Sequence, residues 1–163
     1  MTVGHFLTNK GKLRLLQGAW NTAGNMDIRV GLIASPQPVG LDTAAEIADL
    51  NYVSELLALC TEAYFSTGVS TSYTRKNLLR SNAVEDDTND YISLDADSVV
   101  WEFAGFGYPT GTQNTLYGAF FYDATGSSVD TTHLLLSIDW FYAPIITTGG
   151  NITYAINNLY LVF

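Results

Sequence analysis

The chain has 163 residues, of which 47% are apolar and 14% are charged, and its net charge is −9. This length fits one domain, and the many aromatic residues exclude a disordered chain. No Lys or Arg follows Arg80, so residues 81–163 carry ten acidic and no basic side chains, which argues against binding to nucleic acid. The low charged fraction also predicts apolar surface that is buried against other subunits.

The first residues lack the uninterrupted apolar run of a signal peptide, and no stretch approaches the roughly 20 apolar residues of a membrane span. Cys60 is the only cysteine, and its apolar surroundings in the sequence are typical of a buried, inert thiol. These features predict a soluble protein that is made and kept in a reducing cytoplasm, with no membrane partner.

The first predicted helix covers residues 9–20, with Thr8 or Asn9 as its cap. Its apolar residues recur at helical spacing: Leu13, Leu16 and Trp20. Gly11 and Gly18 weaken this segment, so we expect a short helix packed through that apolar face.

The second predicted helix covers residues 43–60. Thr43-Ala-Ala-Glu46 matches a capping box, in which the two side chains satisfy free backbone N–H groups. An apolar stripe with a period near 3.6 residues then runs from Ile47 to Cys60. Asn51 can divide this segment into two shorter helices.

Almost all of the remaining chain is predicted as strand and turn. The strand candidates are Asp27–Ile33, Ser72–Leu79, Tyr91–Leu94, Ser98–Phe103, Leu116–Tyr122, Leu134–Phe141 and Asn151–Phe163. The turn-rich stretches are Glu85–Asp90, Gly105–Asn114, Asp123–Thr131 and Thr147–Gly150. This spacing favours a single domain, mainly β with two short helices, built as an antiparallel β-sandwich or jelly-roll-like fold. We expect the last strand to be held in a sheet, so that its removal makes the protein insoluble.

The acidic stretch Glu85-Asp-Asp-Thr-Asn-Asp90 offers carboxylates and an amide oxygen, the ligands that Ca²⁺ prefers. Its spacing does not match an EF-hand loop, and the same residues are common in hairpin loops. A solvated loop is the favoured interpretation, with a cation site as the alternative.

His133, Ser137 and Asp139 are the residue types of a catalytic triad, and strand periodicity places all three on one face. No elbow or oxyanion-hole sequence accompanies these residues, and the His and Cys residues are too scattered for a zinc site. The sequence therefore predicts a protein that is not an enzyme and has no cofactor or metal.

Phe106 and Tyr108 lie in a Gly- and Pro-rich loop, which is usually at the surface. Exposed aromatics of this kind suit a subunit interface or, as the alternative, stacking on a sugar. With the basic N-terminal residues Lys10, Lys12 and Arg14, they are the candidate interface residues. We expect the basic N-terminal segment and the acidic second half to make contacts of different kinds, including contacts between neighbouring copies.

Several segments, in order along nearly the whole chain, resemble virion proteins of tailed bacteriophages. These segments are Leu7–Lys12, Asp27–Leu32, Asp42–Leu50, Tyr73–Leu78, Glu85–Asp90, Trp101, Leu134–Trp140 and Asn151–Leu159. The resemblance implies a repeated structural component of the particle and assigns no catalytic residue.

Within that class, the size, acidity and aromatic content favour a capsid cement or decoration protein, of a kind that is often trimeric. The expected partners are the major capsid protein and further copies of the chain as a homotrimer, in a virion assembled in the host cytoplasm. The alternatives are a tail tube, adaptor or baseplate component of the same particle and, from another class, a carbohydrate-binding module.

Overall fold

The computed structural model describes residues 4–17, 26–63, 73–79, 84–86, 91–94, 96–101, 115–146, 151–155 and 159–162. These ranges are mainly β, with antiparallel sheets and three short helices. The helices are α1 (Asn9–Leu16), α2 (Ala44–Ala48) and α3 (Val53–Leu59). The strands are β1 (Gly4–Leu7), β2 (Ile28–Ile33), β3 (Lys76–Asn77), β4 (Val84–Asp86), β5 (Tyr91–Leu94), β6 (Val99–Trp101), β7 (Thr115–Asp123), β8 (Leu134–Ile146), β9 (Ile152–Tyr154) and β10 (Leu159–Val162).

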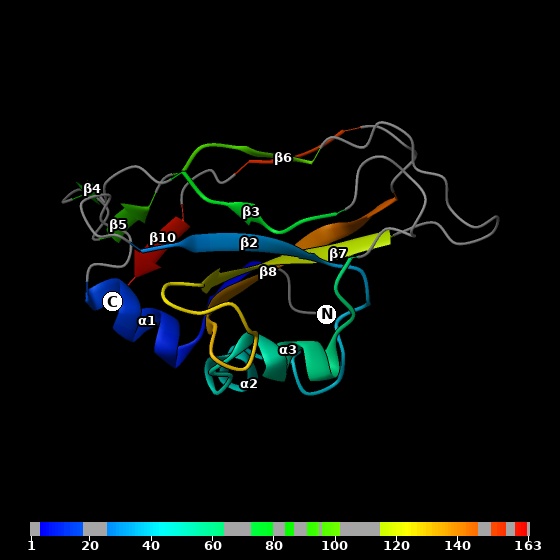
Figure 1. Ribbon diagram of the computed structural model, residues 1–163, viewed down its shortest axis with the longest axis horizontal. Coiled ribbons are helices and arrows are strands. Elements are labelled where there is room, and N and C mark those ends of the chain that lie inside the picture. The colour runs from blue at the N-terminus through cyan, green and yellow to red at the C-terminus, as the bar shows by residue number, and fades with distance from the viewer. Residues whose placement is uncertain are drawn as a thin grey trace.

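A five-stranded sheet with the order β1-β8-β7-β2-β3 forms the centre of the molecule. Helices α2 and α3 lie on one side of this sheet, and the β6–β9 pair lies on the other side (Figure 1). A separate three-stranded sheet has the order β10-β5-β4. The central sheet therefore separates two layers of packing.

The alternation of side chains along β7 supplies both layers. Phe120 and Tyr122 point toward the helices and pack in a core with buried residues of α2 and α3: Ile47, Val53 and Leu56. Phe121 points the other way and packs in a second core with buried residues of β6 and β9: Val99, Trp101 and Ile152. β7 is thus buried on both faces, which explains its nearly unbroken apolar sequence.

The capping box at Thr43 and Glu46 is confirmed, and so is the division of the second helical segment at Asn51. The break has a structural cause. The Asn51 carbonyl accepts a hydrogen bond from the Leu135 backbone N–H at 3.0 Å, so the chain between α2 and α3 is tied to β8 instead of continuing as helix. The Glu55 carboxylate accepts from the Asn51 N–H at 2.6 Å and begins α3.

The expectation that α1 packs through Leu13 and Leu16 is wrong. Leu13 and Leu16 are 49% and 71% exposed, whereas Gly11 is buried against β8. The helix ends at Leu16, and Trp20 lies outside the described residues. Helical spacing correctly placed Leu13 and Leu16 on one face of the helix, but this face points outward and the opposite side meets the sheet.

The C-terminal segment predicted as one strand is two strands in different sheets. β9 pairs with β6, whereas β10 pairs with β5. Two short strands, β1 and β4, were not predicted, and β4 includes Glu85 and Asp86 of the stretch expected to be a loop. Only Lys76–Asn77 of the strand expected over residues 72–79 is extended in a ladder.

β8 runs past the expected end at Phe141 as far as Ile146. Pro144 is tolerated because the ladder is irregular there. Gly118 of β7 pairs with Trp140, but Leu116 pairs with Ile145, so several β8 residues, Pro144 among them, lie opposite a single β7 residue. A proline in such a bulge removes no ladder hydrogen bond.

Candidate functional site

His133, Ser137 and Asp139 do not form a triad. The ladder pairs Phe121 with Ser137 but Tyr122 with Leu135, so Leu136 is an extra residue in β8. Such a β-bulge reverses the alternation of side chains on one side of it. His133 consequently lies on the helix side of the sheet, against Tyr122, whereas Asp139 lies on the opposite side, bonded to Tyr154. The expectation that the three residues share a face is wrong.

Arg75 is the centre of a polar cluster on the helix side of the sheet. Its guanidinium donates to Glu62, with an Nε–Oε1 distance of 2.7 Å, and to both carboxylate oxygens of Asp130. It also lies over the rings of Phe120 and Tyr122, 5.3 and 5.1 Å from their centroids. Arg75 therefore joins β3, the end of α3 and the β7–β8 connection.

His133 extends this cluster by one hydrogen bond. Its Nδ1 lies 3.1 Å from Asp130, and its ring lies 4.9 Å from that of Tyr122. The Arg75 guanidinium is the main cause of a lowered pKa for the Asp130 carboxyl. The Arg75 guanidinium is paired with both the Glu62 and the Asp130 carboxylates, so the cluster has the geometry of a structural ion-pair network.

A second polar cluster lies between the central sheet and β9. His5 pairs across the strands with Asp139, whose carboxylate accepts a hydrogen bond from the Tyr154 hydroxyl. Burial lowers the pKa of His5 to about 4 and raises that of Asp139. Both ring nitrogens of His5 are buried without a hydrogen-bond partner among the described residues, and the ring meets Phe121 edge-on at 5.7 Å.

Cys60 is buried, as expected, and burial raises the pKa of its thiol to about 11. In the ranges that the structure describes, no three His, Cys, Asp or Glu side chains gather closely enough to hold a metal ion. Among the described helices, none combines the length and the hydrophobicity needed to cross a lipid bilayer.

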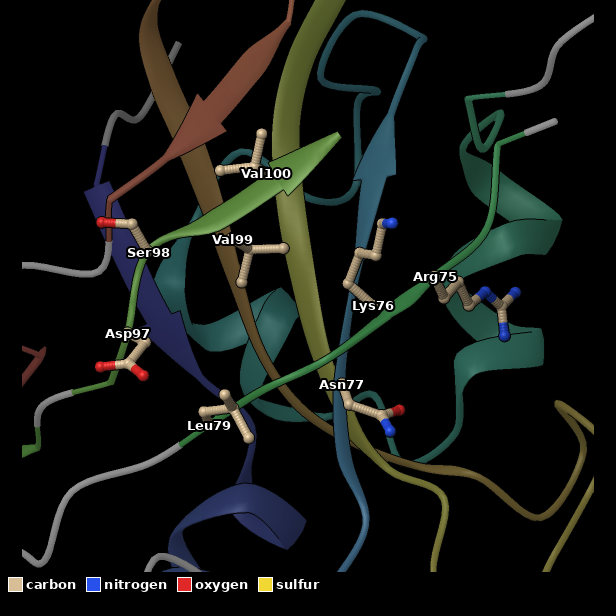
Figure 2. Close-up of a pocket in the computed structure, with 8 residues that line it drawn as sticks. All are labelled: Arg75, Lys76, Asn77, Leu79, Asp97, Ser98, Val99 and Val100. Atoms are coloured by element: carbon tan, nitrogen blue, oxygen red, sulfur yellow. The ribbon is translucent and has the colours of Figure 1, made fainter. Parts of the chain in front are cut away.

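A groove of about 500 Å³ separates β3 from the start of β6 (Figure 2). The two segments are joined at one end, where the Asp97 N–H donates to the Leu79 carbonyl at 2.8 Å. Figure 2 shows Lys76 extending along the groove and Arg75 pointing away from it. The groove runs between two extended segments, and its lining includes Lys76, Asn77, Asp97 and Ser98.

The outward side of α1, which we call the helix surface, consists of Lys12, Leu13 and Leu16. These residues follow the i, i+1, i+4 spacing of one helix face, and all three are exposed. Half-buried Lys10 lies beside them, and neither lysine has an ion-pair partner among the described residues. Residues 4–17 contain three basic and no acidic side chains.

A second exposed apolar region, the arm surface, lies at the open end of the β7–β8 pair. It consists of Val39, Tyr142, Pro144, Ile145 and Ile146, with Val39 and Tyr142 94% and 89% exposed. Val39 and Pro144 also border a groove of about 240 Å³ with Asp42 at its rim. Almost complete exposure of an aromatic and a branched apolar side chain is typical of an interaction surface.

The predicted interface residues differ in their exposure and in their contacts. Lys12 is exposed and Lys10 half-buried, but Arg14 is used within the chain, where its Nε donates to Asp123 at 3.0 Å. Phe106 and Tyr108 lie outside the described residues, as does the end of the acidic stretch, residues 87–90. The arm surface was missed. The apolar residues that continue past Pro144 could have indicated this surface, but the strand was predicted to end at Phe141.

No protein-family model, curated protein or solved structure matches this chain in sequence or in structure.

Proposed function

We propose that this protein is a structural component of a tailed-bacteriophage particle, of the capsid cement or decoration type, which binds the outside of the major capsid shell as a homotrimer. The observation behind this proposal is the presence of exposed apolar surface at two separate places on a small domain, the helix surface and the arm surface. Side chains such as Tyr142 and Leu16 gain free energy when they are buried against another subunit.

The electrostatics support an assembled role. The chain is strongly acidic overall, yet the helix surface is basic. Charge patterns of this kind orient subunits as they meet, and repetition over a shell multiplies contacts that are weak one by one. The resemblance of several sequence segments to virion proteins supports a role in a phage particle that is assembled in the host cytoplasm.

The sandwich or jelly-roll-like arrangement belongs to the same proposal. It is supported by the packing of Val99, Trp101 and Ile152 on one face of the central sheet. A small β-rich domain of this kind offers exposed strand ends, such as that of β8, for contact with a shell.

Quantitative protein gels and mass spectrometry of purified virions test the proposal. A cement protein is expected at a copy number comparable to that of the major capsid protein, and purified chain is expected to bind shells that lack it. A few copies per particle would favour the tail component instead. Binding of the chain to glycans in place of shells would favour the carbohydrate-binding module.

A further inference from the structure

We infer that copies of this chain associate head to tail, with the basic helix surface of one copy on the apolar arm surface of the next and on Asp42 beside it. The inference rests on the proposed assembly role but identifies the partner and the two contacting surfaces. Its test needs only the purified chain, so its failure is separate from a failure to bind shells.

The two surfaces lie at opposite ends of the long β7–β8 pair (Figure 1). α1 is bound at one end, through Leu136 and through Asp123, the last residue of β7. The arm surface surrounds the other end, where Thr115 pairs with Ile146. β7 has nine residues. At about 3.3 Å per residue, roughly 25 Å separates the two ends. One chain cannot bring its own two surfaces together.

Charge complementarity identifies the occupant as a second copy. The loop over residues 34–43, which lines the groove beside Val39, contains Asp42 and no Lys or Arg. Asp42 lines the groove and is exposed. Lys10 and Lys12 on the helix surface provide the opposite charge beside the apolar Leu13 and Leu16.

Local attraction is needed because the copies repel one another overall. Each chain has a net charge of −9, so a contact between two acidic regions is opposed by electrostatics. Among the described stretches, residues 4–17 and 73–79 have basic and no acidic side chains, and in the second stretch Arg75 is already paired with Glu62 and Asp130. The segment over residues 4–17 offers Lys10 and Lys12. The favoured contact is therefore between this segment and an acidic region of another copy.

A contact between two different surfaces is heterologous, and it forms a ring when the rotation between neighbours closes. The homotrimer expected for a decoration protein is one such ring. In contrast, a symmetric contact of the helix surface with itself would place lysines against lysines. This difference can be measured with variants that remove one surface at a time.

Sedimentation velocity of the full-length chain over a range of concentration and salt measures the association. The helix variant is Leu13→Ser/Leu16→Ser, the arm variant is Tyr142→Ser/Ile146→Ser, and Val129→Ser is the control. Val129 is 53% exposed, lies on the β7–β8 connection and belongs to neither surface. Each double variant is expected to weaken association about tenfold or more, because exposed apolar side chains that become buried dominate such contacts. The control is expected to associate like the unchanged protein.

An equimolar mixture of the two double variants is decisive. The intact arm surface of the helix variant can bind the intact helix surface of the arm variant. The helix surface of the first and the arm surface of the second are both impaired, so no further copy can be added. We expect the mixture to form one-to-one pairs and no larger species. Pairs are not expected from either variant alone at the same concentration.

The electrostatic part is tested by charge reversal. Lys12→Glu and Asp42→Lys are each expected to weaken association several-fold, and the combined variant to recover most of it. Association of the unchanged chain should also weaken as salt rises from about 0.05 to 0.5 M.

Several results would overturn the inference: a strictly monomeric chain at high concentration, unchanged association of either double variant, or loss of association in the helix variant alone. Loss of shell binding in the helix variant with normal self-association would also overturn it, by assigning that surface to the capsid protein. Normal self-association without shell binding would instead contradict the proposed function.

Discussion

The Cα of Gly11 lies directly on the backbone of Leu136, so close that a β-carbon at residue 11 would be 2.0 Å from the Leu136 carbonyl oxygen. Thr8 makes this approach possible. Its hydroxyl donates to the Leu135 carbonyl at 2.6 Å and accepts from the Gly11 N–H at 2.8 Å. The bulge at Leu136 and the cap of α1 are thus one structural unit, and they leave Leu13 and Leu16 facing outward.

Gly11→Ala is expected to destabilise the protein because the added methyl group meets immovable backbone. Overpacking of this kind costs about 1–3 kcal/mol, even though alanine favours a helix more than glycine does. Urea unfolding of the variant measures the loss. Lys12→Ala, at the exposed neighbouring position, is the matched control and is expected to be nearly neutral. Equal or greater stability of Gly11→Ala would contradict the close contact.

Arg75→Met is expected to destabilise the protein by about 3 kcal/mol, since it leaves the Glu62 and Asp130 carboxylates facing each other without a cation. The Arg75 side chain is only 16% exposed, so solvent replaces little of what is lost. The shift in the midpoint of urea unfolding measures this effect.

Arg29→Met is the matched control for Arg75. The Arg29–Asp27 pair has side chains that are 39% and 34% exposed, and pairs at the surface are worth about 0–1 kcal/mol. Equal losses in the two variants would show that Arg75 has no special role in joining β3 to α3 and the β7–β8 connection.

Stability is expected to fall as the pH is lowered from 6.5 to about 4, because His5 is held neutral in the folded protein and binds a proton more readily when unfolded. The folded pKa is below the unfolded one, so the unfolded state takes up the extra proton in this window and acid favours unfolding. The full difference is about 3 kcal/mol. Urea unfolding at a series of pH values measures the slope.

Carboxyl groups with shifted pKa values modify this pH dependence, and Asp130 and Asp139 act in opposite directions. The lowered pKa of Asp130 adds stability that is lost as the pH falls toward that pKa. The raised pKa of Asp139 acts in the opposite direction, since its protonated form is favoured by folding and acid relieves its burial. His5→Leu is expected to flatten the slope between pH 6.5 and 4. An unchanged slope in that variant would assign the acid sensitivity to other groups.

Deletion of residues 158–163 is expected to produce insoluble protein. The deletion removes β10, which pairs with β5 over four residues from Leu159 to Val162. β5 keeps β4 on its other side, so the exposed edge becomes available for pairing with other chains. Solubility after expression and light scattering measure the outcome, with deletion of Phe163 alone as the control. A soluble, normally folded product would show that β10 is dispensable.

Local signals predicted the local structure well. The capping box at Thr43 and the break at Asn51 depend on residues a few positions apart, and both occur as expected. The apolar alternation over residues 27–33 likewise predicted β2. In each case the hydrogen bonds or the periodicity that decide the structure lie within one segment.

The candidate sites were less predictable because they depend on partners far along the chain. Arg75 contacts Glu62 and Asp130, which no spacing connects to it. The face of β8 that Ser137 occupies depends on one inserted residue, Leu136, whose sequence is ordinary. The extension of β8 to Ile146 depends on a bulge that accommodates Pro144.

The sequence by itself determined a mainly β, acidic chain whose basic residues lie in its first half, because composition and short-range periodicity require no knowledge of contacts. Only the tertiary structure decided which residues face outward. The position of Gly11 on Leu136 turns Leu13 and Leu16 of α1 away from the sheet, and the β7–β8 pair places the arm surface at the far end. Exposure is a property of the whole packed chain, since a side chain is buried or free according to what other segments leave uncovered.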